Sequence, residues 1–169
     1  LQAVGNPCTD GGEVLPLHGS IANTPAEQVN WYEEDGALVI KTKTVDETIF
    51  GRKLRLHRTC TFPVGRNEFT FSDTVENTGD REEPFELLYH MNMGYPLLDE
   101  DSIVKIASRE VIPRDEHAAE DLENWMHMEK PAAGYAERCY YHRMADKGYA
   151  SIFQPKIGAG LALEYDAKE

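Results

Sequence analysis

The sequence predicts an all-β protein built from antiparallel strands. Apolar and polar residues alternate with a period of two from Val29 onward, as in LVIKTKTV at 38–45, which places successive side chains on opposite faces of a sheet. Turn signals separate these runs at short intervals, and short connections favour antiparallel neighbours. The sequence has no internal repeat and no low-complexity linker. We therefore expect one sandwich-like domain over residues 1–169.

The strongest local signal is Asp35-Gly36, which is typical of a tight hairpin between strands at 29–34 and 37–45. Further turns are expected at 63–67 and 77–80. Two short segments could be helical: 25–28, with Thr24 as its cap, and 115–128, which could equally be an excursion loop. The remaining predicted strands cover 52–62, 68–76, 85–93, 103–107, 137–142, 150–154 and 161–165.

The composition indicates an acidic protein with a net charge of −13, and the acidic residues are scattered along the chain. This charge argues against nucleic acid or an anionic membrane as a partner. The three cysteines, Cys8, Cys60 and Cys139, lack metal-type spacing and are interpreted as reduced thiols. No apolar run approaches the roughly 20 residues of a membrane span, and the first residues do not resemble a signal peptide. A cytoplasmic location is the default expectation.

Two histidines stand out. His90 lies in LLYHMNMGYPLL at 87–98, inside an otherwise apolar predicted strand, and an imidazole can donate or accept a proton near neutral pH. His18 precedes Gly19, which allows a ligand to approach the backbone closely. Either histidine could instead be structural, His90 as a core side chain bonded to a backbone carbonyl.

Together with LRLHRT at 54–59 and FTFSDTVENTG at 69–79, these two segments resemble the aldose 1-epimerase (galactose mutarotase-like) superfamily, in its DUF4432-like, epimerase-related branch. The resemblance covers most of the chain. It implies a large antiparallel super-sandwich, here incomplete at both ends, as in an internal piece of a longer protein. It also implies an isomerase that interconverts the anomers of an aldose by opening and reclosing the hemiacetal ring, with no cofactor.

That reaction needs a base at the anomeric hydroxyl and an acid at the ring oxygen. His90 suits the role of acid, and by resemblance His18 corresponds to the histidine that binds the sugar near its ring oxygen. The family's catalytic glutamate lies in a late strand. Glu164 is in a late predicted strand but lacks the glycine and proline expected around that residue, so we expect the general base beyond Glu169.

Residues that could bind the sugar surround these histidines. Asn92 is two positions after His90 and would share its sheet face. An arginine could hold sugar hydroxyls with its planar fork of donors, although the sequence does not choose among Arg52, Arg55, Arg58 and Arg114. Trp31 and Trp125 could stack on a sugar, although packing roles are commoner for tryptophan. The candidate substrate-binding residues are Asn92, Tyr95, Arg55, Arg114, Asp115 and Glu137.

Three functions remain open at this point. The leading one is an aldose 1-epimerase acting on a monosaccharide, and the second is a carbohydrate-binding module without catalysis. The third is a metal-dependent β-sandwich enzyme with His18, His57 and His90 as ligands, which the lack of a His-x-His pattern makes less attractive. The sequence does not choose the sugar, its phosphorylation state or the oligomeric state.

Overall fold

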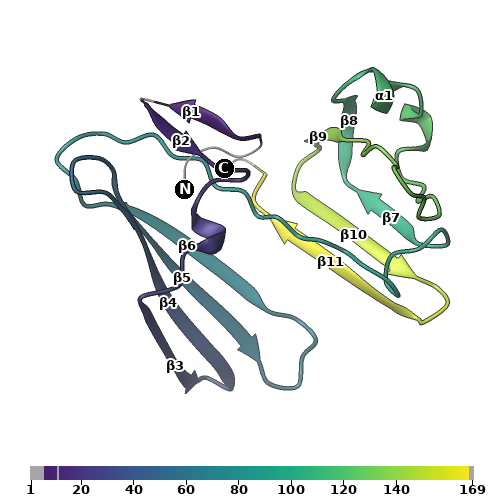
Figure 1. Cartoon of the computed structure of the whole chain (residues 1–169). Helices are drawn as coiled ribbons and strands as arrows, with labels where there is room; N and C mark the ends of the chain where they lie inside the picture. The colour runs from purple at the N-terminus through teal and green to yellow at the C-terminus, as the bar shows by residue number, and fades with distance from the viewer. Residues whose placement is uncertain (1–5, 11, 168–169) are drawn as a thin grey trace. The chain divides into compact units, whose positions relative to one another are not determined.

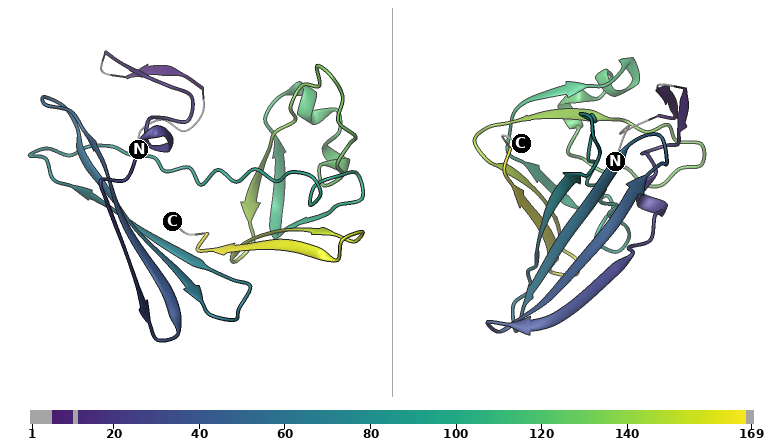
Figure 2. Two further views of the ribbon diagram at one scale, coloured as in Figure 1. Left: turned by 60° about the horizontal axis from the view of Figure 1, so that its bottom comes forward. Right: turned by 90° about the vertical axis from the view of Figure 1, so that its left-hand side faces the viewer.

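The computed structural model describes residues 6–10 and 12–167 (Figure 1; further views in Figure 2). These residues form two compact units, one ending at His90 and the other beginning at Met91, and each is described by itself. Within the described residues the regular structure is almost entirely strand, and every sheet is antiparallel. The prediction of an all-β, antiparallel fold is therefore confirmed.

The first unit contains a four-stranded sheet in the order β3-β4-β5-β6. Its hairpin between β3 and β4 turns at Asp35 and Gly36, whose φ angles are 50° and 73°. Positive φ at both central residues is what the favoured hairpin turn requires, so the predicted Asp-Gly hairpin is confirmed. The strands are β3 (Gln28–Glu34), β4 (Ala37–Glu47), β5 (Lys53–Pro63) and β6 (Thr70–Asn77).

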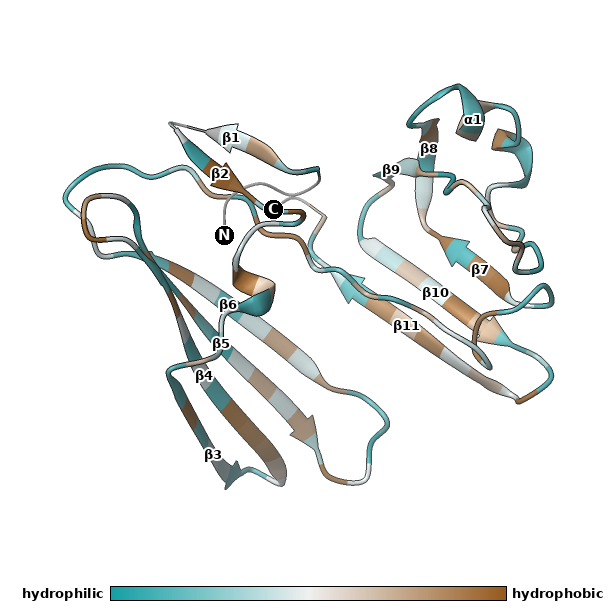
Figure 3. Ribbon diagram, in the orientation of Figure 1, coloured by the Kyte–Doolittle hydropathy of each residue, from teal (hydrophilic) through white to brown (hydrophobic). Residues whose placement is uncertain are grey.

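Apolar and polar residues alternate along these strands, as the bands of colour along β4 and β5 show (Figure 3). Successive side chains of a strand point to opposite faces of its sheet. Leu54 and Leu56, two residues apart on β5, are 1% and 6% exposed and share a face. Val39 on β4 is buried as well. Burial of apolar side chains of this size stabilises a fold by roughly 1.5–3 kcal/mol each, so these residues are the main anchors of the sheet.

A short hairpin, β1 (Cys8–Asp10) and β2 (Glu13–Leu15), precedes this sheet and was not expected, because three-residue strands carry too little alternation to detect. The helix predicted at 25–28 is wrong. The turn forms earlier, as a 3-10 helix η1 (Ile21–Asn23), and the backbone N–H of Thr24 closes it by donating to Ile21. Glu27 donates its N–H to the carbonyl of Lys43, which draws the predicted helical residues into the edge of the sheet.

The second unit contains a three-stranded sheet in the order β11-β10-β7 and a separate two-stranded sheet, β8-β9. Segment 115–128 holds a short helix whose N-cap is Asp115, as its Oδ1 accepts from the N–H of Ala118 at 2.9 Å. The elements are β7 (Ile103–Ile106), β8 (Ser108–Pro113), α1 (Glu116–Ala119), η2 (Leu122–Asn124), β9 (Tyr140–Met144), β10 (Gly148–Gln154) and β11 (Ala159–Tyr165).

The strand predicted at 85–93 does not form: this segment has no ladder partner among the described strands. Several of its apolar side chains are exposed, including Phe85 and Leu88 at 50% and 44%. Alternation predicts which way side chains point, but whether a segment becomes a strand of a sheet also depends on the fold around it. In the same way, β9 starts at Tyr140 and not at 137, because its ladder begins opposite Pro113 of the unpredicted β8.

No described helix is both long enough and apolar enough to cross a membrane. The three cysteines are free, as expected: Cys8 is exposed, and Cys60 and Cys139 are partly exposed.

Candidate functional site

His18 occupies a strained turn directly after β2. The N–H of Gly19 donates to the carbonyl of Pro16 at 2.9 Å, and this bond closes a four-residue turn with His18 in its third position. The φ of His18 is 60°, in the left-handed region that few residues other than glycine adopt. Such a conformation costs of order 1 kcal/mol and is frequent at functional sites. The turn therefore presents His18 in a fixed backbone conformation.

The rings of His18 and His90 lie together within the first unit, with centroids 5.0 Å apart and planes inclined by 53°. The two histidines that the family resemblance assigns to one sugar therefore do lie close together. Both residues are exposed. His90 is accordingly neither part of a strand nor a buried core residue, and its imidazole is accessible to a ligand.

Arg52 braces the hairpin that leads into the His18 turn. Its guanidinium contacts Asp46 at 2.9 Å and also donates to Glu13 of β2, and the side chains of Arg52 and Asp46 are both only 8% exposed. Burial is the largest single influence on Asp46 and opposes its ionisation, but hydrogen bonds and nearby positive charges, with the hydrogen bond from Arg52 the strongest of them, together lower the pKa of this carboxyl. Arg52 is thus engaged in the fold and is a poor candidate for a sugar clamp.

Arg55 is occupied by a carboxylate, since its Nε donates to Glu47 at 2.9 Å. On the same face of β5, Nε2 of His57 lies 3.0 Å from Glu76. His57 therefore has a carboxylate partner of its own. Among the described residues, no group of three or more His, Cys, Asp or Glu side chains is arranged to hold a metal ion.

In the second unit the structure brings together three of the predicted binding residues. Arg114 donates to Asp115 at 3.1 Å and to Glu137 at 2.7 Å, and its Nη1 also contacts Sγ of Cys139 at 2.9 Å. The hydrogen bond from Arg114 lowers the pKa of Glu137, so this carboxylate is ionised at neutral pH. Arg114, Asp115 and Glu137 are exposed and their charges compensate one another. Hydroxyl groups of a ligand could therefore replace some of the hydrogen bonds within this cluster.

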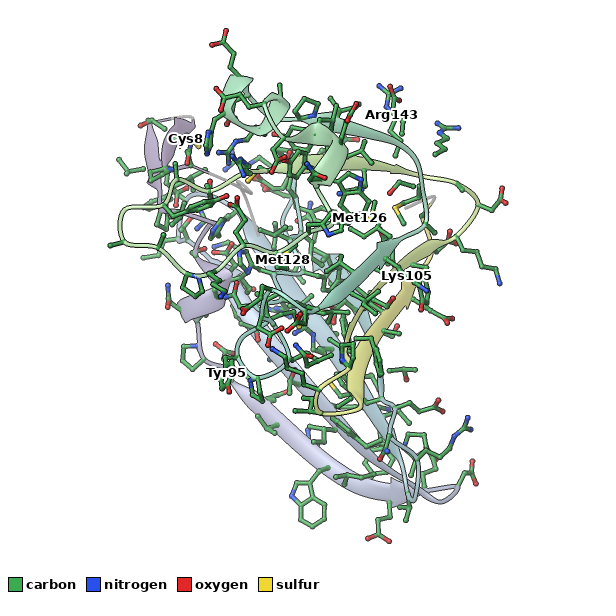
Figure 4. All side chains as sticks on the ribbon, turned by 90° about the vertical axis from the view of Figure 1, so that its right-hand side faces the viewer. Cys8, Tyr95, Lys105, Met126, Met128 and Arg143 are labelled. Carbon is green, nitrogen blue, oxygen red and sulfur yellow. The ribbon has the colours of Figure 1, made fainter. Side chains whose placement is uncertain are left out.

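The second unit also contains a cavity of about 890 Å³, whose wall includes none of Arg114, Asp115 and Glu137. Tyr95, 86% exposed, is on its wall, as is Met128 from a different segment; Figure 4 labels both residues. Arg138 donates to Asp121 at 3.0 Å and to the hydroxyl of Tyr135 at 2.9 Å. The other aromatic residues of the wall are Trp125 and Tyr140.

Aromatic and charged residues share the wall of this cavity, and the charges are paired. Besides Arg138, Lys156 contacts Asp99 at 3.2 Å, and Lys130 contacts Glu100 at 3.6 Å. A wall of aromatic faces and compensated charges suits a neutral polar ligand better than an ion. Sequence reasoning missed Tyr135, Arg138 and Tyr140, although the run GYAERCYY at 134–141 combines aromatic and basic residues and could have indicated them.

Asn92 is exposed and lies just after the boundary between the two units. Because residues 85–93 are not a strand, the period-two argument that places Asn92 on the face of His90 does not apply. Glu164 lies in β11, opposite Tyr149, and is exposed.

The fold is that of the aldose epimerase-like β-sandwiches. The chain is similar to the crystal structure of a "putative aldose 1-epimerase" from Klebsiella pneumoniae subsp. pneumoniae MGH 78578, with a TM-score of 0.88 and 22% identity over 98% of this chain. It spans 45% of the length of that protein. The chain belongs to the family described as "Domain of unknown function (DUF4432)", which matches residues 1–169. No curated protein matches it.

Proposed function

We propose that the protein is an aldose 1-epimerase that interconverts the anomers of a monosaccharide at a site containing His18 and His90. The observation that carries this proposal is the approach of the two exposed imidazole rings to 5.0 Å, with His18 in a left-handed turn. The epimerase-like fold agrees with it. Two imidazoles at this separation can address neighbouring oxygens of one sugar ring.

In the proposed reaction, His90 in its protonated form gives a proton to the ring oxygen while a general base takes the proton of the anomeric hydroxyl. The bond between C1 and the ring oxygen then breaks, and an open-chain aldehyde forms. Rotation about C1–C2 exposes the other face of the carbonyl. The freed hydroxyl adds back, both proton transfers reverse, and the protein returns to its initial protonation state. His18 donates to or accepts from the sugar near its ring oxygen.

We also propose that the general base lies outside these 169 residues, in a part of the protein corresponding to the remainder of the longer solved relative. Asn92, Tyr95, Arg114, Asp115 and Glu137 remain candidate sugar contacts. Arg55 is the weakest, since Glu47 already holds it. A cytoplasmic location and a single β-sandwich domain over residues 1–169 also belong to the proposal.

The test is polarimetry on a panel of aldohexoses, with the 169-residue chain and with a longer chain that continues past Glu169. The longer chain should accelerate mutarotation and the short one should do so little. His90→Asn in the longer chain should lower kcat by roughly 10²–10⁴, the effect of losing a general acid. His57→Asn is the matched control, since His57 is an exposed histidine of the same unit paired with Glu76, and its rate should not change. An unchanged rate in His90→Asn would refute the proposal.

The second candidate is a carbohydrate-binding protein without catalysis, which the aromatic, charge-compensated cavity of the second unit favours. Calorimetric titration with the same sugars separates the two functions. Saturable binding by the longer chain without any acceleration of mutarotation would establish the binding module in place of the isomerase.

A further inference from the structure

The strand β3 forms one edge of the four-stranded sheet, and no described strand pairs with its outer side (Figure 1). Proteins usually protect such an edge with proline, lysine, a bulge or a very short strand. The sequence of β3, QVNWYEE, contains neither proline nor lysine, and its ladder with β4 runs from Gln28 to Glu34 without a shift of register. The edge strand β11, AGLALEY, is by contrast rich in glycine and alanine, which favour strands less.

Alternate residues of β3 direct their backbone groups away from the sheet. The two-residue turn between β3 and β4 closes on a hydrogen-bonded pair, Glu34 with Ala37. Hydrogen-bonded and non-hydrogen-bonded pairs alternate along an antiparallel ladder, so the other even-numbered residues of β3 also turn their N–H and C=O groups toward β4. Val29, Trp31 and Glu33 therefore turn theirs toward the outer edge.

The side chains of these three residues lie on one face of the sheet, and the two apolar ones are exposed. Trp31 is 71% exposed and Val29 is 59% exposed. Trp31 also begins an apolar row that crosses the sheet through Ile40, Cys60 and Phe71. A strand added at the outer edge of β3 would extend both the ladder and this row, and it would cover a tryptophan, the residue type that most often dominates the energy of an interface.

We propose that the outer edge of β3 binds a second copy of this chain, with the two β3 strands antiparallel about a two-fold axis at Trp31. Trp31 of one copy then faces Trp31 of the other, and Val29 faces Glu33. This register pairs all three outward-facing residues, whereas any other register leaves at least one of them without an outward-facing partner on the second β3.

The charges of β3 agree with this register. Glu33 lies opposite Val29 of the other copy, and Glu34 lies opposite Gln28, so no two carboxylates are directly opposite each other. A register centred on Glu33 would instead set like charges face to face, which is destabilising. The inference concerns the assembly of the protein and does not depend on the proposed function.

The association should be weak and reversible. Each copy carries a net charge of −13, so two copies repel each other. A single strand edge also buries less than the roughly 1,200–2,000 Å² of stable complexes. We therefore expect a dimer that forms at high protein concentration and that added salt strengthens, because salt screens the repulsion.

The first test is sedimentation equilibrium of the 169-residue chain. The average mass should rise from 19.1 kDa toward twice that value between about 10 µM and about 1 mM protein. Trp31→Thr keeps a β-branched residue in the strand and should weaken the association about 10-fold or more. Phe50→Thr is the matched control, because Phe50 is 95% exposed in the turn between β4 and β5, and this substitution should leave the association unchanged. A mass of 19.1 kDa at every concentration, or equal weakening by the two substitutions, would overturn the inference.

The second test is hydrogen exchange, which identifies the surface that pairs. The amides of Val29, Trp31 and Glu33 should exchange several-fold more slowly at about 1 mM than at about 10 µM protein. The amides of Asn30 and Tyr32 already face β4 and should exchange at the same rate at both concentrations. A dimer without this alternating protection would form through another surface, and the inference would be wrong.

The third test repeats both measurements on the longer chain that continues past Glu169. The same dependence on concentration and the same alternating protection would extend the dimer to the longer protein. Amides of Val29, Trp31 and Glu33 that are already protected at about 10 µM, in a chain that stays monomeric, would show that another segment of the same protein covers β3. That result would overturn the pairing of two copies.

Discussion

Arg52 and Asp46 form a buried ion pair at the end of β4, with 2.9 Å between guanidinium and carboxylate and each side chain 8% exposed. This pair ties Arg52, in the turn between β4 and β5, to Asp46 near the end of β4. The second contact of Arg52, with Glu13, connects the same turn to the β1–β2 hairpin that precedes His18. A pair of this kind is sensitive to the loss of one partner, because the remaining charge stays buried. The stability of the His18 side of the site should therefore depend on Asp46.

We predict that Asp46→Ala lowers the free energy of unfolding by about 1.5–3 kcal/mol, the range for losing a hydrogen bond between charged groups, because Arg52 keeps Glu13 as its second partner. Glu76→Ala is the control, because Glu76 belongs to an exposed pair with His57, and such pairs contribute less than about 1 kcal/mol. Urea denaturation followed by circular dichroism measures both. Equal losses in the two variants would contradict the structural role assigned to Arg52.

The turn between β3 and β4 allows a prediction about backbone conformation alone. A Cβ added at Gly36 meets nothing within 4 Å, yet its φ is 73°. Gly36→Ala should thus lower the free energy of unfolding by about 1–2 kcal/mol, the cost of placing an L-residue in the left-handed region. At Gly94 a Cβ also has open space, without the positive φ, so Gly94→Ala should be close to neutral. Thermal unfolding of both variants checks the difference.

His142 leads to a prediction about pH. Its Nδ1 lies 2.8 Å from the hydroxyl of Ser108, and burial lowers the pKa of this imidazole below its ordinary value of about 6.5. The unfolded chain therefore binds the proton more readily than the folded one. The contribution of neutral His142 to the free energy of unfolding is therefore complete above about pH 6.5 and is lost as the pH falls below that value.

The free energy of unfolding of the unmodified protein should therefore decrease between about pH 8 and about pH 5, and His142→Gln should decrease less. Urea denaturation at both pH values provides the measurement. Parallel changes in the two proteins would show that other groups cause the pH dependence.

The four-stranded sheet of the first unit was predicted well because the sequence signals that specify it are local. An Asp-Gly turn fixes the register of a hairpin, and alternation over the eleven residues of β4 or β5 fixes which side chains face the core. The alternating pattern at 85–93 led to a wrong prediction because pairing with a neighbouring strand is a property of the whole fold and not of the segment. None of the described sheets includes this segment.

The candidate site was predictable only in part. The pairing of His18 with His90 followed from a resemblance to a family, and composition or spacing alone would not have given it. The side-chain contacts that hold distant segments of the first unit together could not be predicted from the sequence. Arg52 contacts Glu13, which is 39 residues away in the chain, and Tyr89 contacts Asp73, which is 16 residues away. Such contacts depend on cross-strand register and on turns that bring distant segments together, neither of which a residue pattern specifies.

The aromatic cavity of the second unit allows a prediction about sugar binding that intrinsic fluorescence can test. The chain has two tryptophans, of which Trp125 lines the cavity, with its ring 4.7 Å from that of His142, while Trp31 is 71% exposed on β3. The second candidate function, carbohydrate binding at this cavity, predicts that titration of a Trp31→Phe protein with a neutral aldose changes the Trp125 emission saturably, because a bound sugar replaces water at the indole face. In the matched Trp125→Phe protein, where only Trp31 emits, the same titration should leave the emission unchanged. Equal responses of the two proteins would place the sugar away from this cavity, whereas a response confined to Trp125 would make Tyr135 and Arg138, whose hydroxyl and guanidinium lie 2.9 Å apart in the wall, the next residues to substitute.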